Sequence, residues 1–176
     1  DPELRAAEEA VARVRDLDAD LGDTASEATT ATAVLRLLPD LLGGDGPRRW
    51  FVAFENPAEA RGLGGFLGNY AELTATDGKV RLTRSGAISE LERPPGARHL
   101  LGPEEYLDRY GRFDPADYFR DATFSPSLPL DAQVIRQLYP QSGGRRIDGV
   151  LAMDPYTLAQ LLRITGPIRV PGYPRL

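Results

Sequence analysis

The chain has 176 residues, of which 41% are hydrophobic and 27% are charged, a balance typical of one globular domain with a single core. Its formal net charge of −5 disfavours nucleic acid as the main partner, and the lack of cysteine excludes disulfides and thiolate metal sites. No run of about eighteen apolar residues occurs, which excludes a membrane-spanning helix within these residues.

The first 43 residues are predicted to form a helical hairpin or stalk. Apolar side chains recur at intervals of three and four from Leu4 to Leu21 and again from Val34 to Leu41, with Gly22 between the two helices. Residues 1–45 carry eleven acidic side chains against four arginines, a net charge of −7, so the remainder carries +2. We therefore expect an acidic helical hairpin over residues 1–43 and an α/β domain over residues 44–176.

Short strands are predicted to begin the α/β domain. The apolar run from Trp50 to Phe54 is typical of a strand that is buried on both faces. Residues 66–74 and 79–84 flank the sequence Thr-Asp-Gly, which predicts a β-hairpin with a tight turn. Pro- and Gly-rich loops then lead to a short helix at 103–110 and to an irregular segment at 114–129.

The end of the chain alternates helices with strands. The patterns predict a helix at 130–139, a strand at 147–153, a helix from Pro155 to Ile164 with Asp154 as its N-cap, and a strand at 168–170. Helices alternating with strands late in the chain, after an early hairpin, indicate the α/β class. The expected architecture is a mixed central sheet with helices on both faces, preceded by the helical hairpin.

A polar, glycine-rich segment follows the strand that ends at Phe54, and it is the first candidate site. Ligands usually bind at the carboxyl ends of strands in open α/β sheets. Arg61 is suited to binding a phosphate or carboxylate through two N–H donors, and Gly64 and Gly65 to presenting backbone N–H groups to the same anion. Asn56, Glu59 and Glu55 carry oxygen atoms that suit Mg²⁺. The alternative is a structural loop with surface charges, and the glycine spacing matches neither a P-loop nor a dinucleotide fingerprint.

Two further features are candidate parts of a site, and a third argues against two kinds of site. Residues 120–129 bring Asp121, Thr123 and Ser125 into an irregular segment that is either part of a pocket or a loop packed by its own aromatic side chains. Arg145, with the next arginine, precedes a strand and forms either an anion patch or a solvated strand start. The single histidine, His99, makes a zinc site or a histidine-based triad improbable, and no nucleophile–base pair can be identified.

Residues 56–66, 121–129 and 147–171, in this order, resemble the bacterial envelope family catalogued as domain of unknown function 4012, which is frequent in actinobacteria. Members of that family typically have an N-terminal transmembrane helix, a helical region and an extracytoplasmic domain. The resemblance covers about residues 48–172. It implies a protein that is extracytoplasmic and anchored in the membrane by a segment outside these 176 residues.

The same segments are more remotely similar to the LytR–CpsA–Psr phosphotransferases, which move glycopolymers from a polyprenyl-pyrophosphate carrier to the cell wall. In that resemblance Arg61 matches the arginine of the second family motif, and Glu55 or Asn56 lies near the metal-binding Asp at the end of the first strand. The chain departs from the pattern in two places: Gly62-Leu63-Gly64 lacks the acidic residue of the second motif, and Arg84-Ser85-Gly86 stands where the family has Pro-Arg-Asp.

These resemblances imply a domain that binds, and on one reading transfers, a glycopolymer linked to a lipid phosphate or pyrophosphate. Arg61 and Asp121 would be the catalytic residues, and Asn56, Glu59, Gly64, Gly65, Arg84 and Arg145 would bind the ligand, with Mg²⁺ held by Asn56 and Glu59. Each lost charge-stabilising group costs about 2.7–4 kcal/mol in such reactions. A non-catalytic scaffold or polymer-binding module at the cell surface is therefore the rival hypothesis.

Overall fold

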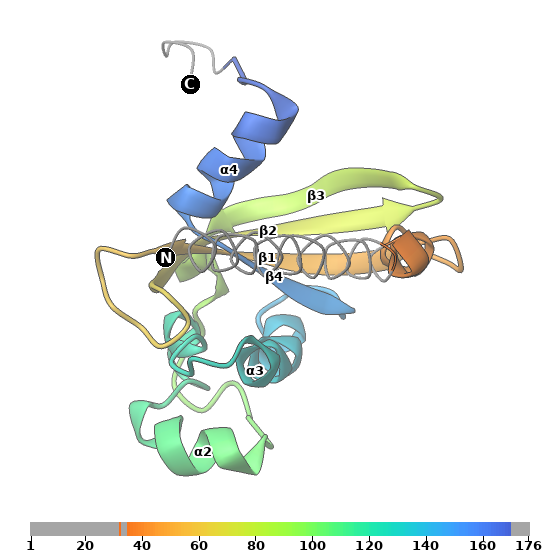
Figure 1. The fold of residues 1–176 in the computed structure, drawn as a ribbon. Helices are drawn as coiled ribbons and strands as arrows, with labels where there is room; N and C mark the ends of the chain where they lie inside the picture. Colours follow the sequence, from red (N-terminus) through yellow and green to blue (C-terminus); the bar gives the residue numbers. More distant parts are fainter. Residues whose placement is uncertain (1–31, 33–34, 170–176) are drawn as a thin grey trace, which may run out of the picture.

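A four-stranded mixed sheet is the centre of the computed structural model, which describes residue 32 and residues 35–169. Its strands are β1 (Arg48–Asn56), β2 (Phe66–Thr76), β3 (Lys79–Ala87) and β4 (Gly149–Met153), in the order β3-β2-β1-β4 (Figure 1). β1 pairs antiparallel with β2 and parallel with β4, so the sheet is mixed, as the sequence predicts.

Local sequence explains the sheet. β1 lies between β2 and β4, and Phe51, Val52 and Ala53 at its middle are all buried, which fits its continuous apolar run. β2 and β3 are joined by a two-residue turn at Asp77 and Gly78, whose φ angles are 48° and 77°. Two successive positive φ angles define the hairpin turn whose twist matches that of the flanking strands, so the predicted hairpin is confirmed.

The core lies between one face of the sheet and helix α3 (Leu128–Gln141). Apolar residues on one side of α3, among them Val134, Ile135 and Leu138, are fully buried. The ring of Phe51 stacks on Tyr70 at 5.7 Å between centroids and meets the edge of Tyr139 at 4.9 Å. Aromatic pairs at such distances contribute beyond their buried area, and here they fix α3 against the central strands.

Helices lie on both sides of the sheet. α2 (Glu104–Tyr110) and α3 lie on one side, and α4 (Pro155–Thr165) rises from the other (Figure 1). Three short 3₁₀ helices, η1 (Ile88–Leu91), η2 (Gly111–Phe113) and η3 (Phe119–Asp121), connect the elements between β3 and α3. α4 begins as predicted, because the Asp154 carboxylate accepts a 2.6 Å hydrogen bond from the Thr157 N–H.

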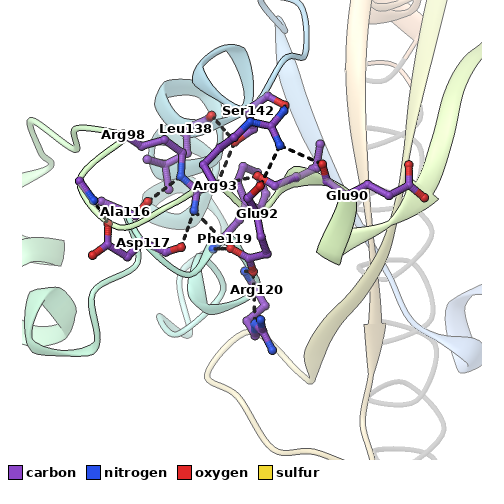
Figure 2. A network of polar contacts seen from close by, with 12 residues as sticks. Glu90, Glu92, Arg93, Arg98, Ala116, Asp117, Phe119, Arg120, Leu138 and Ser142 are labelled. Atoms are coloured by element: carbon purple, nitrogen blue, oxygen red, sulfur yellow. Dashed lines mark hydrogen bonds and ion pairs between the residues drawn. The ribbon is translucent and has the colours of Figure 1, made fainter.

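A buried arginine organises the long segment between β3 and α3. The Arg98 side chain is fully buried and donates hydrogen bonds to the carbonyls of Leu91, Ala116 and Asp117 at 2.8, 2.6 and 2.6 Å. It also donates to the Ser142 hydroxyl at 2.9 Å and pairs with Glu92 at 3.3 Å. Figure 2 shows this network around Arg98. The loop predicted at 92–98 is thus held to the end of α3 from inside.

Two predicted elements at the ends of the chain are not confirmed. Most of the N-terminal hairpin predicted at residues 1–43 lies outside the described part of the chain. Of its described residues, 35–41 form one continuous helical stretch. The strand predicted at 168–170 is not present at Ile168 and Arg169, which have no regular structure, while residue 170 lies outside the described part. Within residues 32 and 35–169, no helix has both the length and the apolar character needed to cross a membrane.

Candidate functional site

A hollow of about 450 Å³ opens at the edge of the sheet where the parallel strands β1 and β4 end. Phe54 from β1, Phe66 from β2, Met153 from β4 and Leu158 from α4 form its apolar wall. The carboxyl edge of parallel strands is where open α/β sheets usually bind ligands, and the volume lies in the range of small-molecule pockets.

The polar lining of this hollow is acidic. Glu55, Asn56 and Glu59 come from the end of β1 and the loop after it, and Asp154 comes from the start of α4. Burial, and to a lesser extent the charge of Asp154, raises the pKa of Glu55 to about 7. Three carboxyl groups without a lining cation attract positive charge, so the hollow by itself does not attract a free phosphate.

Arg61 does not line this hollow, but it contacts an aromatic ring that does. Its guanidinium carbon lies 5.5 Å from the centre of the Phe66 ring, which lines the hollow, and 5.2 Å from the centre of the Phe124 ring. Only 22% of its side chain is exposed, and its Nη2 is 3.8 Å from Oδ1 of Asp121. The structure therefore brings the two predicted catalytic residues together as an ion pair, and the guanidinium of this pair also lies over two aromatic rings.

The guanidinium of Arg61 is only partly hydrogen-bonded. Its Nη1 donates to the Ala60 carbonyl at 3.0 Å, whereas its Nε is buried without a partner among the described residues. The 3.8 Å contact with Asp121 is too long for a hydrogen bond. Burial raises the pKa of Asp121, although the charge of Arg61 opposes that shift. A guanidinium in this state is able to donate a hydrogen bond to a further anionic oxygen if Asp121 moves or is replaced.

The glycines of the 57–65 loop allow it to pack closely. A Cβ atom on Gly62 would lie 2.0 Å from the Phe124 carbonyl oxygen, and one on Gly65 would lie 2.6 Å from the Asn56 carbonyl group. The N–H of Gly64 donates to the Arg61 carbonyl at 3.2 Å, so it closes a turn instead of facing an anion. These glycines position Arg61 against the 121–125 segment, which explains the glycine density seen in the sequence.

Buried polar groups gather where this loop meets the start of α3. Asp131 of α3 is fully buried, and its Oδ1 accepts a hydrogen bond from the Ser125 N–H at 3.3 Å. Burial raises the pKa of Asp131 to about 8, the hydrogen bond from the Ser125 N–H opposes this shift, and the charge of Glu55 adds to it. The Leu63 N–H donates to the carbonyl of Thr123, which is also fully buried, at 3.4 Å.

The structure places the other predicted anion-binding residues elsewhere. Arg84 donates to the Gly143 carbonyl at 2.9 Å and lies 5.5 Å from the centre of the Tyr70 ring. Arg145 is exposed in the connection between α3 and β4. Neither arginine lines the hollow, and the hydrogen bond of Arg84 directs its guanidinium to the end of α3.

The predicted Mg²⁺ site at Asn56 and Glu59 can be judged by its surroundings. Both residues line the hollow and are exposed, but Asn56 Oδ1 already accepts a hydrogen bond from the Ala58 N–H at 3.1 Å. No group of three or more His, Cys, Asp or Glu side chains able to hold a metal occurs in residues 32 and 35–169. The Mg²⁺ site at Asn56 and Glu59 therefore stays a prediction.

Sequence reasoning missed two residues that the structure makes prominent. Asp131 stands within the apolar repeat of α3 at the spacing of Val134, Ile135 and Leu138, and this polar residue in a core stripe was an available signal. Glu92 lies in a Pro- and Gly-rich loop and interacts with the Arg98 and Arg120 side chains. Arg98 is six residues away and Arg120 lies in a different segment, twenty-eight residues away. No helix or strand periodicity links the three residues, so no local pattern could have identified Glu92.

These features define an α/β domain with a four-stranded mixed sheet and a candidate binding hollow at the ends of its two parallel strands. A family model described as "Protein of unknown function (DUF4012)" matches residues 45–176. The chain therefore belongs to that family, which confirms the family membership expected from the first resemblance. No curated protein and no solved structure matches the chain.

Proposed function

We propose that this protein is a membrane-anchored, extracytoplasmic domain of the cell envelope that binds a glycopolymer linked to a lipid phosphate or pyrophosphate. The remote similarity to the LytR–CpsA–Psr proteins and the actinobacterial character of the sequence belong to this proposal. The observation that carries it is Arg61, a partly buried cation whose Nε has no partner among the described residues and which contacts Phe66, a ring that lines an apolar-walled hollow.

A lipid phosphate has the two chemical parts that this arrangement suits. Its hydrocarbon chain needs apolar surface, which the hollow offers through Phe54, Met153 and Leu158. α4 extends this surface, because it has no buried residue and leaves Leu161 and Ile164 exposed at 44% and 84%. The phosphate needs a cation outside the acidic lining, and Arg61 supplies one at its edge.

Binding of a short prenyl phosphate, compared with the prenol of equal chain length, tests the proposal. By isothermal titration calorimetry we expect the wild type to prefer the phosphate by about 10–100-fold, the ratio that one charge-assisted hydrogen bond gives. Arg61→Ala should lose this preference while keeping affinity for the prenol. Arg109→Ala removes an arginine from an exposed ion pair and serves as the matched control.

Equal affinity of the wild type for the two ligands, or an unchanged preference in Arg61→Ala, would refute phosphate recognition at this site. Transfer activity is a separate question, addressed by measuring phosphate release from a prenyl pyrophosphate in the presence of added Mg²⁺. Loss of that release in Arg61→Ala, with binding of the prenol retained, would assign Arg61 to the reaction.

The second candidate is a non-catalytic scaffold or polymer-binding module. The observation that favours it is the Arg61–Asp121 ion pair, because a guanidinium already beside a carboxylate has less charge to offer a ligand. Co-sedimentation with isolated cell-wall polymer, unaffected by Arg61→Ala and without affinity for prenyl phosphate, is the result that selects this function.

A further inference from the structure

Unpartnered polar atoms are concentrated at one place inside the protein. In the described part of the chain, six buried side-chain nitrogen or oxygen atoms lack a hydrogen-bond partner. Four of them belong to residues at the junction of the 57–65 loop, the 121–125 segment and α3: Glu55 Oε1, Arg61 Nε, Thr123 Oγ1 and Asp131 Oδ2. Unsatisfied buried groups are rare in native proteins, so a cluster of them marks a candidate binding site.

Contacts between the segments hold these residues near one another. Leu63 of the loop donates to the Thr123 carbonyl, and Ser125 donates to Asp131. A Cβ atom added to Gly64 would lie 3.2 Å from Glu55 Oε2, so the Glu55 carboxyl lies against the same loop. Glu55, Thr123 and Asp131 are 6%, 0% and 0% exposed, and each has one oxygen without a partner.

The chemistry of the three free oxygens indicates the kind of occupant. A water molecule provides hydrogen bonds but carries no charge to balance the ionised forms of Glu55 and Asp131. The positive charge of Arg61 is directed to Asp121, with which it forms an ion pair. Two carboxylates and a hydroxyl are ligands that hard cations prefer, and two negative charges match one divalent ion.

We propose that Glu55, Thr123 and Asp131 bind a hard divalent cation, of the Mg²⁺ or Ca²⁺ class, in the interior between the 57–65 loop and the start of α3. This site is distinct from the one predicted at Asn56 and Glu59, because those two side chains are exposed and line the hollow. The cation ties the loop that carries Arg61 to α3. The proposal concerns the fold of this loop and stands whether or not the protein binds a lipid phosphate.

Titration of Mg²⁺ and of Ca²⁺ into protein freed of metal with a chelator tests the proposal. Calorimetry should detect saturable binding of one ion per chain. At a cation concentration 100 times the dissociation constant, the midpoint of thermal unfolding should rise by about 5–10 °C, because binding to the folded state alone stabilises it by mass action.

Three variants and a control locate the ion. Glu55→Gln and Asp131→Asn should weaken binding at least tenfold, and Thr123→Val should weaken it less, because it removes a neutral ligand. Glu59→Gln changes an exposed carboxylate on the same loop and should leave the dissociation constant within about twofold of the wild type. If Asp131→Asn does not fold, Glu55→Gln and Thr123→Val decide the outcome.

The proposal is overturned if neither cation binds, because the two carboxyls are then neutralised by protons instead. It is also overturned if the interior variants bind as the wild type does, or if Glu59→Gln alone abolishes binding, because the ion then lies in the hollow and not in the interior.

Discussion

Replacing Arg98 with methionine should destabilise the protein severely. The side chain of Arg98 is fully buried, and its removal leaves acceptors on Leu91, Ala116 and Asp117 without a donor. Each is a main-chain carbonyl, so no second substitution can remove the unsatisfied group. Breaking a buried ion pair by removing one partner costs about 3–5 kcal/mol. The Glu92 side chain is 18% exposed and can be rehydrated, which reduces the cost of breaking the pair. The three orphaned carbonyls add about 1 kcal/mol or more each, so we expect the free energy of unfolding to fall by about 3–5 kcal/mol.

Urea unfolding followed by circular dichroism measures this loss. A shift of 3–5 kcal/mol corresponds to a fall of roughly 6–20 °C in the unfolding midpoint of a chain of this size. Arg109→Ala is the control, because Arg109 and its partner Glu105 are 65% and 56% exposed and such pairs contribute less than about 1 kcal/mol. If Arg98→Met lowers the free energy of unfolding by less than about 1 kcal/mol, the network is not a main support of the fold and the reasoning is wrong.

Two further predictions concern the loop and the last helix. Gly62→Ala should lower the free energy of unfolding by about 1–3 kcal/mol, because its Cβ would lie 2.0 Å from the main-chain oxygen of Phe124. The control is Gly68→Ala, whose Cβ would meet only a side-chain atom at 3.9 Å and which should be near neutral in the same urea titration. Equal effects of the two substitutions would contradict the close approach of the loop. Hydrogen bonds from the Thr157 side chain and N–H lower the pKa of Asp154. The stabilising effect of its carboxylate is therefore present above the unfolded pKa of about 4 and is lost as the pH falls through the lower folded pKa. Thermal unfolding from pH 6 to 2 should show a smaller pH dependence in Asp154→Asn than in the wild type, and an unchanged profile would exclude this contribution.

The regular elements could be predicted because their signals are local. The turn at Asp77 and Gly78, the cap at Asp154 and the apolar run of β1 each depend on neighbouring residues whose preferred conformations agree with the fold. The strand predicted at 168–170 shows the limit of this reasoning. Residues with high strand propensity form a strand only where a partner offers its N–H and C=O groups, and Ile168 and Arg169 have no such partner in the described part of the chain.

The candidate site could be predicted only in part, because its pairings join distant segments. The sequence singled out Arg61 and Asp121 separately, and the structure joins them in an ion pair although they lie far apart along the chain. It also suggested Arg84 as a second anion ligand, but the pleat of β3 directs that side chain to Tyr70 and to the end of α3. Strand register decides such outcomes, since a shift of one residue reverses the face on which a side chain lies.

Glu55 belongs to both proposed sites, the lipid-phosphate hollow and the interior cation site. A variant that distinguishes the two sites must therefore change a different residue. Glu55 lines the hollow and also belongs to the buried cluster, because a bulge between Phe54 and Glu55 interrupts the regular pairing of β1 with β2 at this point. Glu55→Gln should therefore change both cation binding and the charge of the hollow. Asp131 does not line the hollow, so Asp131→Asn reports on the interior cation alone. A loss of cation affinity in Asp131→Asn with an unchanged preference for prenyl phosphate would show that the two sites function independently. A joint loss would instead indicate that the cation holds the 57–65 loop, and hence Arg61, in its binding position.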